Sequence, residues 1–380
     1  MGLEALLLLM TSIVISAILA HKLGVSSALF EVIAGVMIGL LFPTFFYEVE
    51  WLRIFADIGL VFLMFIAGME VSAKMLVSDL KTNLSLGVAS FLIPFLAMYG
   101  FALIFFGEKA FILALATSST AVGVTYLSLE NSGLLKDKSA QNILSAAMIN
   151  DIISLLAMSI WLYVILYEVD FISFIQLILV VIAVAIGTHF ARVYGNKFTM
   201  TLFGIEIHEL DTKIACALAC FLAIAVEFLG AHAAIGAFLA GLIIETEEEI
   251  HGKRLLGKVK QIGFGFFIPI FFVYVGILIA KFGIDIGQIL WMIIFAFIAI
   301  FSRMIPLAII IFTNNVRFRN ALAFAASTTP RLSVALALTM AVLEAGILPG
   351  FILNIIVGIA LITTCLAPVL TDKLSQKELI

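Results

Sequence analysis

Residues 139–166 read SAQNILSAAMINDIISLLAMSIWLYVIL, an apolar run in which Asp151 is the one charged residue. A run of this length can cross a bilayer as a single helix, and a carboxylate near its centre is costly to keep there. By default an ionisable group in such a position indicates a path for an ion or a proton rather than a structural need. Asp151 is therefore the starting point for a functional interpretation of the chain.

The whole chain has the composition of a membrane protein. Of its 380 residues 64% are hydrophobic and 12% are charged, and the mean hydropathy is +1.24. Soluble domains are about 45–50% apolar and about 25% charged. The composition therefore excludes an ordinary soluble enzyme and predicts an all-α protein that crosses the membrane many times. The first residues are not typical of a secretory signal, because Glu4 stands where basic residues are expected.

Apolar runs bounded by charges or turn residues predict thirteen transmembrane helices. If successive helices alternate in direction, three Lys and Arg residues lie on one side of the membrane and sixteen on the other. The basic side is cytoplasmic by the positive-inside rule, so the N-terminus lies outside and the C-terminus inside. We expect a multi-pass protein of the cell (plasma) membrane with no nucleic-acid partner. The predicted spans are 3–20, 25–43, 54–69, 83–106, 110–129, 139–166, 170–193, 210–228, 231–246, 261–280, 285–312, 318–344 and 349–370.

Two stretches of the chain resemble each other. Residues 21–41 (HKLGVSSALFEVIAGVMIGLL) align with residues 227–246 (EFLGAHAAIGAFLAGLIIET) at an offset of 206, which pairs Gly35 with Gly241. A six-helix unit therefore occurs twice, and copies that start seven helices apart have opposite orientations. Such an inverted repeat is typical of alternating-access transporters. The predicted division is a first repeat at 1–166, a linker helix and connection at 167–209, a second repeat at 210–370 and a cytoplasmic tail at 371–380.

Polar patches interrupt the fifth and twelfth predicted helices at matching places. Thr117, Ser118, Ser119 and Thr120 form the first, and residues 327–330 (STTP) form the second, at an offset of 210. Hydroxyl side chains compete for the backbone, and a proline removes a backbone donor. Ser and Thr could simply hold neighbouring helices together, but two equivalent patches favour two discontinuous helices. Their ends would offer carbonyl and hydroxyl oxygens to a cation.

Four charged groups lie within the predicted spans and need partners or water, because a lone buried charge is unstable: Asp151, Arg303, Arg331 and Glu227. Asp151 either forms a static ion pair with an arginine or binds a proton and a cation such as Na+ in alternation. Arg303 is a fixed positive charge in the eleventh helix. Arg331 either balances the carbonyl ends at the second break or pairs with Glu70 or Asp151. Glu70, at the end of the third helix, either caps or pairs structurally or belongs to an inner gate.

Asn150 is about 100° around the helix from Asp151, so the two side chains face different neighbours. Its amide cannot carry a second proton, and Arg303 stays protonated at any working pH. With one titrating carboxylate beside a fixed cation, the residues predict that one monovalent cation exchanges for one proton. Such a cycle is electroneutral.

Several stretches resemble the monovalent cation:proton antiporters, and they occur in that family's order. The likeness is to family 2, which contains the NapA-type sodium/proton exchangers and the membrane domains of Kef potassium efflux systems, and it covers essentially the whole chain. The stretches are GLVFLMFIAGMEV (59–71), ATSSTAVG (116–123), INDII (149–153), GAHAAIGAFLAGLII (230–244), PIFFVYVGI (269–277) and TPRLSVALAL (329–338).

The resemblance implies a fold like that of NhaA and NapA, with two crossing unwound helices and a homodimer that works by an elevator-like movement. It implies a core domain of helices 3–6 and 10–13 and a dimerisation domain of the remainder. Asp151 matches the aspartate that binds cation and proton, and residues 117–120 match the unwound helix beside it. Asn150 stands where electrogenic members have Asp, and Arg303 stands where they have Lys. Both departures resemble the electroneutral pattern.

The leading hypothesis is exchange of Na+, with Li+ as a second candidate, for H+, with no cofactor and no enzymatic activity. A K+/H+ antiporter or a Kef-like K+ efflux subunit is the alternative, because hydroxyls, carbonyls and one carboxylate suit either ion. An organic-anion symporter would be expected to have more polar groups at the crossing. An intramembrane aspartyl protease needs a second deep aspartate, which the sequence does not supply.

Overall fold

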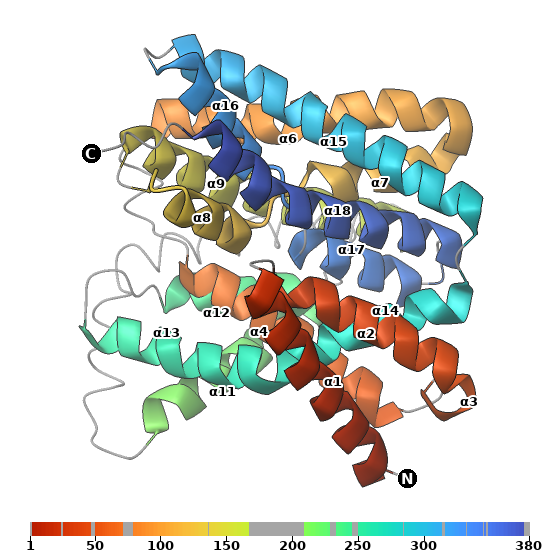
Figure 1. The fold of residues 1–380 in the computed structure, drawn as a ribbon. Helices are drawn as coiled ribbons and strands as arrows, with labels where there is room; N and C mark the ends of the chain where they lie inside the picture. Colours follow the sequence, from red (N-terminus) through yellow and green to blue (C-terminus); the bar gives the residue numbers. More distant parts are fainter. Residues whose placement is uncertain are drawn as a thin grey trace. The chain divides into compact units, whose positions relative to one another are not determined.

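The computed structural model describes helices and the connections between them (Figure 1). Among the described residues, seven helical stretches are long and apolar enough to cross a membrane: Leu3–Lys22, Glu50–Glu70, Leu80–Ser118, Lys138–Met158, Arg254–Phe282, Ile286–Phe312 and Gly350–Leu374. The count of thirteen stays a prediction, because the predicted helix 170–193 lies outside the described residues, as does nearly all of the linker. The described residues are 2–23, 26–46, 50–70, 79–135, 137–166, 209–228, 233–244, 250–283, 285–313, 316–331, 333–344, 346 and 349–375.

Packing divides the chain into two compact units. Unit 1 comprises residues 1–73 and 159–283, and unit 2 comprises residues 74–158 and 284–380. Unit 1 contains α1 (Gly2–Leu23), α2 (Ser27–Leu41), α3 (Pro43–Phe46), α4 (Glu50–Glu70), α11 (Leu210–Phe228), α12 (Ala233–Ile243), α13 (Ile250–Ile262), the π-helical segment η2 (Gly263–Phe267) and α14 (Ile268–Phe282). Unit 2 contains α6 (Leu80–Phe106), the 3-10 turn η1 (Gly107–Lys109), α7 (Ala110–Ser118), α8 (Val122–Asn131), most of α9 (Lys138–Leu166), α15 (Ile286–Thr313), α16 (Phe318–Ser327), α17 (Ser333–Glu344) and α18 (Gly350–Leu374).

Glycine pairs set two close helix crossings in unit 1. A Cβ atom added to Gly276 of α14 would lie 2.1 Å from the carbonyl oxygen of Val32 and 2.9 Å from the Cα atom of Gly35 in α2. A Cβ atom added to Gly68 of α4 would lie 3.0 Å from the Cα atom of Gly241 in α12. Small residues allow helix backbones to approach this closely in membranes. Gly35 and Gly241 are aligned in the sequence, so each of the two similar stretches contributes a glycine to one of the crossings.

The two packing units do not by themselves define the core and dimerisation domains, which stay predictions. The helices α4 and α14, which correspond to helices 3 and 10 of the expected core, fall in unit 1. The glycine crossings account for this, because they pack α14 against α2 and α4 against α12. Unit 2 thus holds helices 4, 5, 11, 12 and 13 of the predicted set and most of helix 6.

The helix before η2 begins earlier than expected. The sequence places a span at 261–280, whereas α13 begins at Ile250. Leu255 and Val259 are buried on one face of α13, and its lysines bind acidic residues of unit 1. Lys258 lies 2.9 Å from Asp211 at the start of α11, and Lys260 lies 2.6 Å from Glu70 at the end of α4. These contacts stabilise the helix on the N-terminal side of the predicted span.

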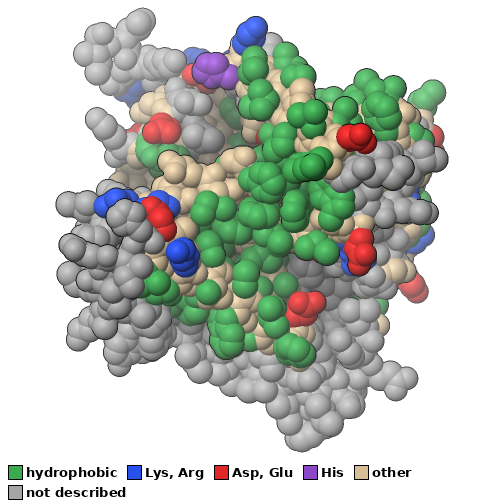
Figure 2. All heavy atoms as spheres, turned by 90° about the horizontal axis from the view of Figure 1, so that it is seen from below, with side chains coloured by type: hydrophobic (Ala, Val, Ile, Leu, Met, Phe, Trp, Pro, Cys, Tyr) green, Lys and Arg blue, Asp and Glu red, His purple; other side chains and the backbone are tan. Residues whose placement is uncertain are grey.

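Apolar side chains cover the outside of both units. Figure 2 shows one face on which hydrophobic side chains form a broad central area with charged groups mainly toward its margins. In α1 and α11 the exposed side chains include Leu7, Ile15, Phe221 and Phe228. Surfaces of this kind are stable against lipid or against another protein rather than against water.

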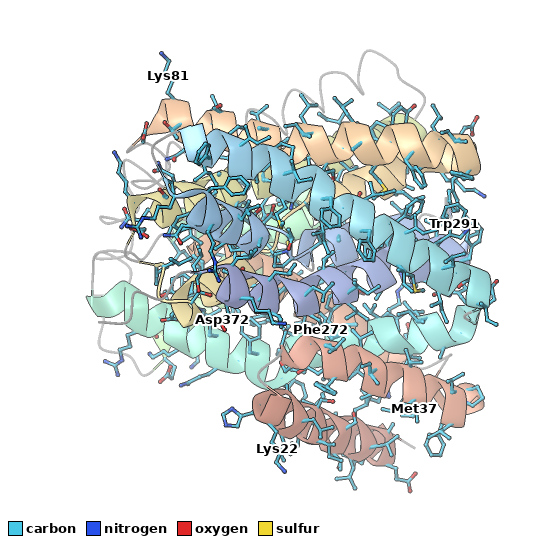
Figure 3. All side chains as sticks on the ribbon, turned by 45° about the horizontal axis from the view of Figure 1, so that its top comes forward. Lys22, Met37, Lys81, Phe272, Trp291 and Asp372 are labelled. Carbon is cyan, nitrogen blue, oxygen red and sulfur yellow. The ribbon has the colours of Figure 1, made fainter. Side chains whose placement is uncertain are left out.

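In unit 2 the short helices α7, α8 and α16 pack against the long helices α6, α15 and α18. α6 packs on α7 and α15, and α18 packs on α8 and α16. In Figure 3, Lys81 at the start of α6 and Asp372 near the end of α18 lie toward one end of these helices, and Trp291 of α15 lies toward the other. Trp291 packs there against Phe105 and Phe106 of α6. The middle of the unit contains the polar residues described next.

Candidate functional site

Two interrupted helices meet in unit 2. α7 ends at Ser118 and α8 begins at Val122, while α16 ends at Ser327 and α17 begins at Ser333. The backbone N–H of Ala121 donates to the carbonyl oxygen of Pro330 over 2.9 Å, which joins the two breaks. Both interruptions therefore occur at the polar patches seen in the sequence.

Hydroxyl groups explain how α7 and α16 end inside the protein. The side chains of Thr117, Ser118 and Ser119 donate to the carbonyls of Leu113, Leu115 and Ala116 over 2.7, 2.9 and 3.1 Å. At the second break, Ser327, Thr328 and Thr329 donate to carbonyls three residues earlier. These bonds satisfy carbonyls near the helix ends. The hydroxyl oxygens keep lone pairs that can accept a further hydrogen bond or bind a cation.

Arg303 of α15 is completely buried and binds both breaks. Its Nη1 donates to the carbonyls of Ser119 and Thr328 over 2.8 and 2.9 Å and to the Thr120 hydroxyl over 2.9 Å. Its Nη2 donates to the carbonyl of Ser118. The carbonyl end of a helix carries a partial negative charge, so it stabilises a cation. Arg303 thus neutralises the ends of α7 and α16 together.

Arg331 makes a second bridge of the same kind. Its Nε donates to the carbonyl of Thr117, and its Nη1 donates to that of Thr329 over 2.9 Å. Its Nη2 donates to the carbonyl of Ala299 in α15 over 2.6 Å. These contacts correspond to the first of the two interpretations, in which Arg331 balances the carbonyl ends at the break. Glu70, which with Asp151 was one of the two acidic partners considered for Arg331, belongs to unit 1 and binds Lys260 there.

Asn150 and Asp151 of α9 have different surroundings. The Asn150 amide nitrogen donates to the Ser90 hydroxyl and to the Ser118 carbonyl, both over 3.0 Å. Its oxygen accepts from the Ser154 hydroxyl over 3.2 Å. Asn150 therefore ties α9 to α6 and α7, which makes it a scaffold for the site.

Asp151 is 3% exposed, and its carboxylate interacts with the backbone of Thr120 and the charge of Arg303. Among the described groups, its Oδ1 atom has no hydrogen-bond partner. A buried carboxylate oxygen without a donor is costly, and a proton or a cation relieves that cost. Asp151 is thus the acidic group at the breaks that can accept either particle.

The structure brings together eight of the nine residues singled out from the sequence. Glu70 alone lies in unit 1. Sequence reasoning missed Ser90, which contacts both Asn150 and Arg303, and Ser154, which supports Asn150. Ser154 could have been found from its position one turn after Asn150. Ser90 carries no such signal, because a single serine in an apolar helix is unremarkable.

An all-helical membrane unit with a buried carboxylate beside two interrupted helices is the arrangement of an ion-coupled transporter. The family model "Sodium/hydrogen exchanger, transmembrane" matches residues 8–375. The chain belongs to this family of antiporters, which confirms the resemblance described above.

Relatives and a solved structure agree with this assignment. The chain is 28% identical to "Probable Na(+)/H(+) antiporter 3" of Methanocaldococcus jannaschii, over 94% of this chain and 92% of that protein. It is 26% identical to the Na(+)/H(+)-K(+) antiporter GerN of Bacillus cereus, over 96% and 93%. The structure of the sodium proton antiporter MjNhaP1 from M. jannaschii at pH 8 has the same fold, with a TM-score of 0.74, 17% identity and coverage of 99% and 98%.

Proposed function

We propose that the chain exchanges Na+ for H+ across the plasma membrane, one cation for one proton, with Asp151 as the shared binding group. The observation that carries the proposal is the contrast within the site. The described donors of Arg303 and Arg331 bind backbone carbonyls and one hydroxyl, whereas an Asp151 oxygen has no described partner. The arginines supply constant charge, and Asp151 is the group whose occupancy changes.

The charge balance supports an electroneutral cycle. Asp151 binds one proton or one monovalent cation, and either adds a single positive charge to the site. The site therefore carries the same charge whichever particle it transports. An exchange rate that responds to an imposed membrane potential would rule out this stoichiometry.

Unit 2 is the candidate moving part in an elevator-type mechanism, because the residues that form the site all lie within it. Unit 1 is the candidate dimerisation domain, and the exposed apolar side chains of α1 and α11 support that role. We further propose a homodimer with its N-terminus outside and its C-terminus in the cytoplasm, as the distribution of basic residues indicates.

K+/H+ exchange is the second candidate. It is favoured by the similarity to GerN, a protein named as a Na(+)/H(+)-K(+) antiporter. The site itself offers one carboxylate and hydroxyl oxygens, which are hard ligands that accept either alkali cation. The oxygen arrangement is compatible with both assignments, so transport must decide between them.

The test is cation-driven proton movement in proteoliposomes that contain Na+, Li+ or K+. Flux driven by Na+ and lost in Asp151→Asn supports the proposal, because the amide cannot exchange a proton. Flux driven by K+ alone supports the second candidate. Absence of flux with every cation, from folded and monodisperse protein, contradicts both.

A further inference from the structure

Pro94 lies inside α6, four residues after Ser90, and both side chains are buried. Proline has no N–H, so it cannot donate to the carbonyl four residues earlier, and its ring displaces that carbonyl from the helix. The carbonyl concerned is that of Ser90. It accepts a hydrogen bond of 3.1 Å from the Nε atom of Arg303.

Ser90 contacts the site in a second way. Its hydroxyl accepts from the Asn150 amide over 3.0 Å and donates to the carbonyl of Gly87 over 2.8 Å. A single residue of α6 thus holds both the amide that precedes Asp151 and the fixed positive charge beside it. The Ser90 hydroxyl accepts a hydrogen bond from Asn150, and the Ser90 backbone carbonyl accepts one from Arg303.

The Nε contact determines how the guanidinium is oriented. The group is planar and its donors are fixed relative to one another. When Nε binds the Ser90 carbonyl, the plane is anchored on the α6 side, and Nη1 and Nη2 bind the two breaks. An anchor at Ser90 therefore keeps the charge of Arg303 on the carbonyl ends of α7 and α16 and away from a closer approach to Asp151.

We propose that Pro94 is a positioning residue for ion binding. It leaves the Ser90 carbonyl without a donor in its own helix, and so provides the acceptor that holds Arg303 in place. The test of this inference by ion transport rests on the proposed function, whereas its test by protein unfolding does not. A proline that only bent α6 would affect packing in the same way whichever side chain stood at position 303.

The first experiment is a double-mutant cycle of Pro94→Ala with Arg303→Lys. Alanine restores an N–H that competes for the Ser90 carbonyl, so Arg303 loses its anchor and moves toward Asp151, where it competes with the cation. We expect the Na+ concentration for half-maximal exchange to rise at least about threefold in Pro94→Ala, with less than about a twofold change in maximal rate. Lysine has no Nε–H at that position, so in Arg303→Lys the added Pro94→Ala change should have no further effect.

The matched control is Pro368→Ala in α18, a proline inside another helix of the same unit. The carbonyl that it leaves free, that of Thr364, is not among the acceptors described for Arg303. This variant should retain the wild-type half-saturation. Pro94→Gly restores the same N–H and serves if Pro94→Ala does not yield folded protein.

The second readout is the unfolding temperature of the four proteins of the cycle: the wild type, Pro94→Ala, Arg303→Lys and the double variant. Non-additive shifts in Pro94→Ala and Arg303→Lys support the coupling, and additive shifts overturn it. If the wild type exchanges ions while Pro94→Ala raises the half-saturating Na+ concentration by less than about threefold, the inference fails and the proposed function stands. If the wild type transports no cation, the proposed function fails, and the unfolding cycle alone decides the inference. If Arg303→Lys is inactive in transport, the unfolding temperatures of the cycle likewise decide the inference.

Discussion

The backbone N–H of Ala121 donates to the carbonyl oxygen of Pro330 over 2.9 Å, so the two interrupted helices are hydrogen-bonded to each other at their breaks. The carbonyl ends of α7 and α16 therefore lie together, and Arg303 and Arg331 each bind both ends. The buried charges and the two breaks form one connected site. A substitution in one of these residues should consequently affect the others.

Competition at Asp151 predicts the pH dependence of transport. When a proton and a cation exclude each other, lowering the pH should raise the half-saturating Na+ concentration by about tenfold per unit while the carboxyl is mostly protonated. The maximal rate should change much less. Initial rates measured over a range of Na+ concentrations at each pH would check this. A half-saturation that is constant over several pH units would contradict competition.

Replacement of Arg331 should mainly reduce stability. Arg331→Gln removes the charged donor of three buried carbonyls, at a cost on the order of 3 kcal/mol. The thermal midpoint should fall by several degrees. Lys81→Gln, at an exposed position of α6, is the control and should cost less than about 0.5 kcal/mol. Equal midpoints for the two variants would show that the carbonyl contacts of Arg331 contribute little.

Asn150→Ala should be more harmful than Ser154→Ala. The first change removes the donor to the Ser90 hydroxyl, one of the two donors to the Ser118 carbonyl and the acceptor of the Ser154 hydroxyl, and should cost about 1–3 kcal/mol. The second removes one donor to Asn150 and should cost about 1 kcal/mol. Unfolding midpoints and exchange rates of both variants would measure this. The reverse order would mean that Asn150 does not organise the site.

The glycine crossings can be tested without touching the site. Gly276→Ala places a Cβ atom 2.1 Å from a backbone oxygen of α2, and overpacking of this kind costs about 1–3 kcal/mol. Gly100→Ala in α6 meets nothing within 4 Å and should stabilise the helix by up to about 1 kcal/mol. Thermal unfolding midpoints of the two variants would check this. A lower midpoint for Gly276→Ala alone would show that the helix crossing, rather than glycine replacement in general, causes the loss of stability.

The sequence revealed the site through residue types that are expensive in lipid. Asp151, Arg303 and Arg331 stand out because their runs are otherwise apolar, and the paired polar patches mark where the helices break. The partners of the arginines could not be deduced in the same way. A backbone carbonyl exists at every position, so its availability depends on three-dimensional packing and, for Ser90, on a proline four residues away.

The packing of helices against one another depends on features that the sequence does not show directly. Gly35 and Gly241 were visible as an aligned pair, but their contacts with Gly276 and Gly68 depend on how the helices cross. Those contacts place α4 and α14 in unit 1. The thirteen-helix count and the inverted repeat stay predictions.

The arginines of the site have a consequence for how ion selectivity can change. Their described acceptors are backbone carbonyls and one hydroxyl, none of which gains or loses charge with pH. Under the proposed cycle Arg303 and Arg331 contribute a constant electrical bias, and the occupancy of Asp151 is the part that changes. We therefore expect variants that alter the oxygens around the carboxylate to change which alkali cation is carried while the voltage dependence of exchange stays the same.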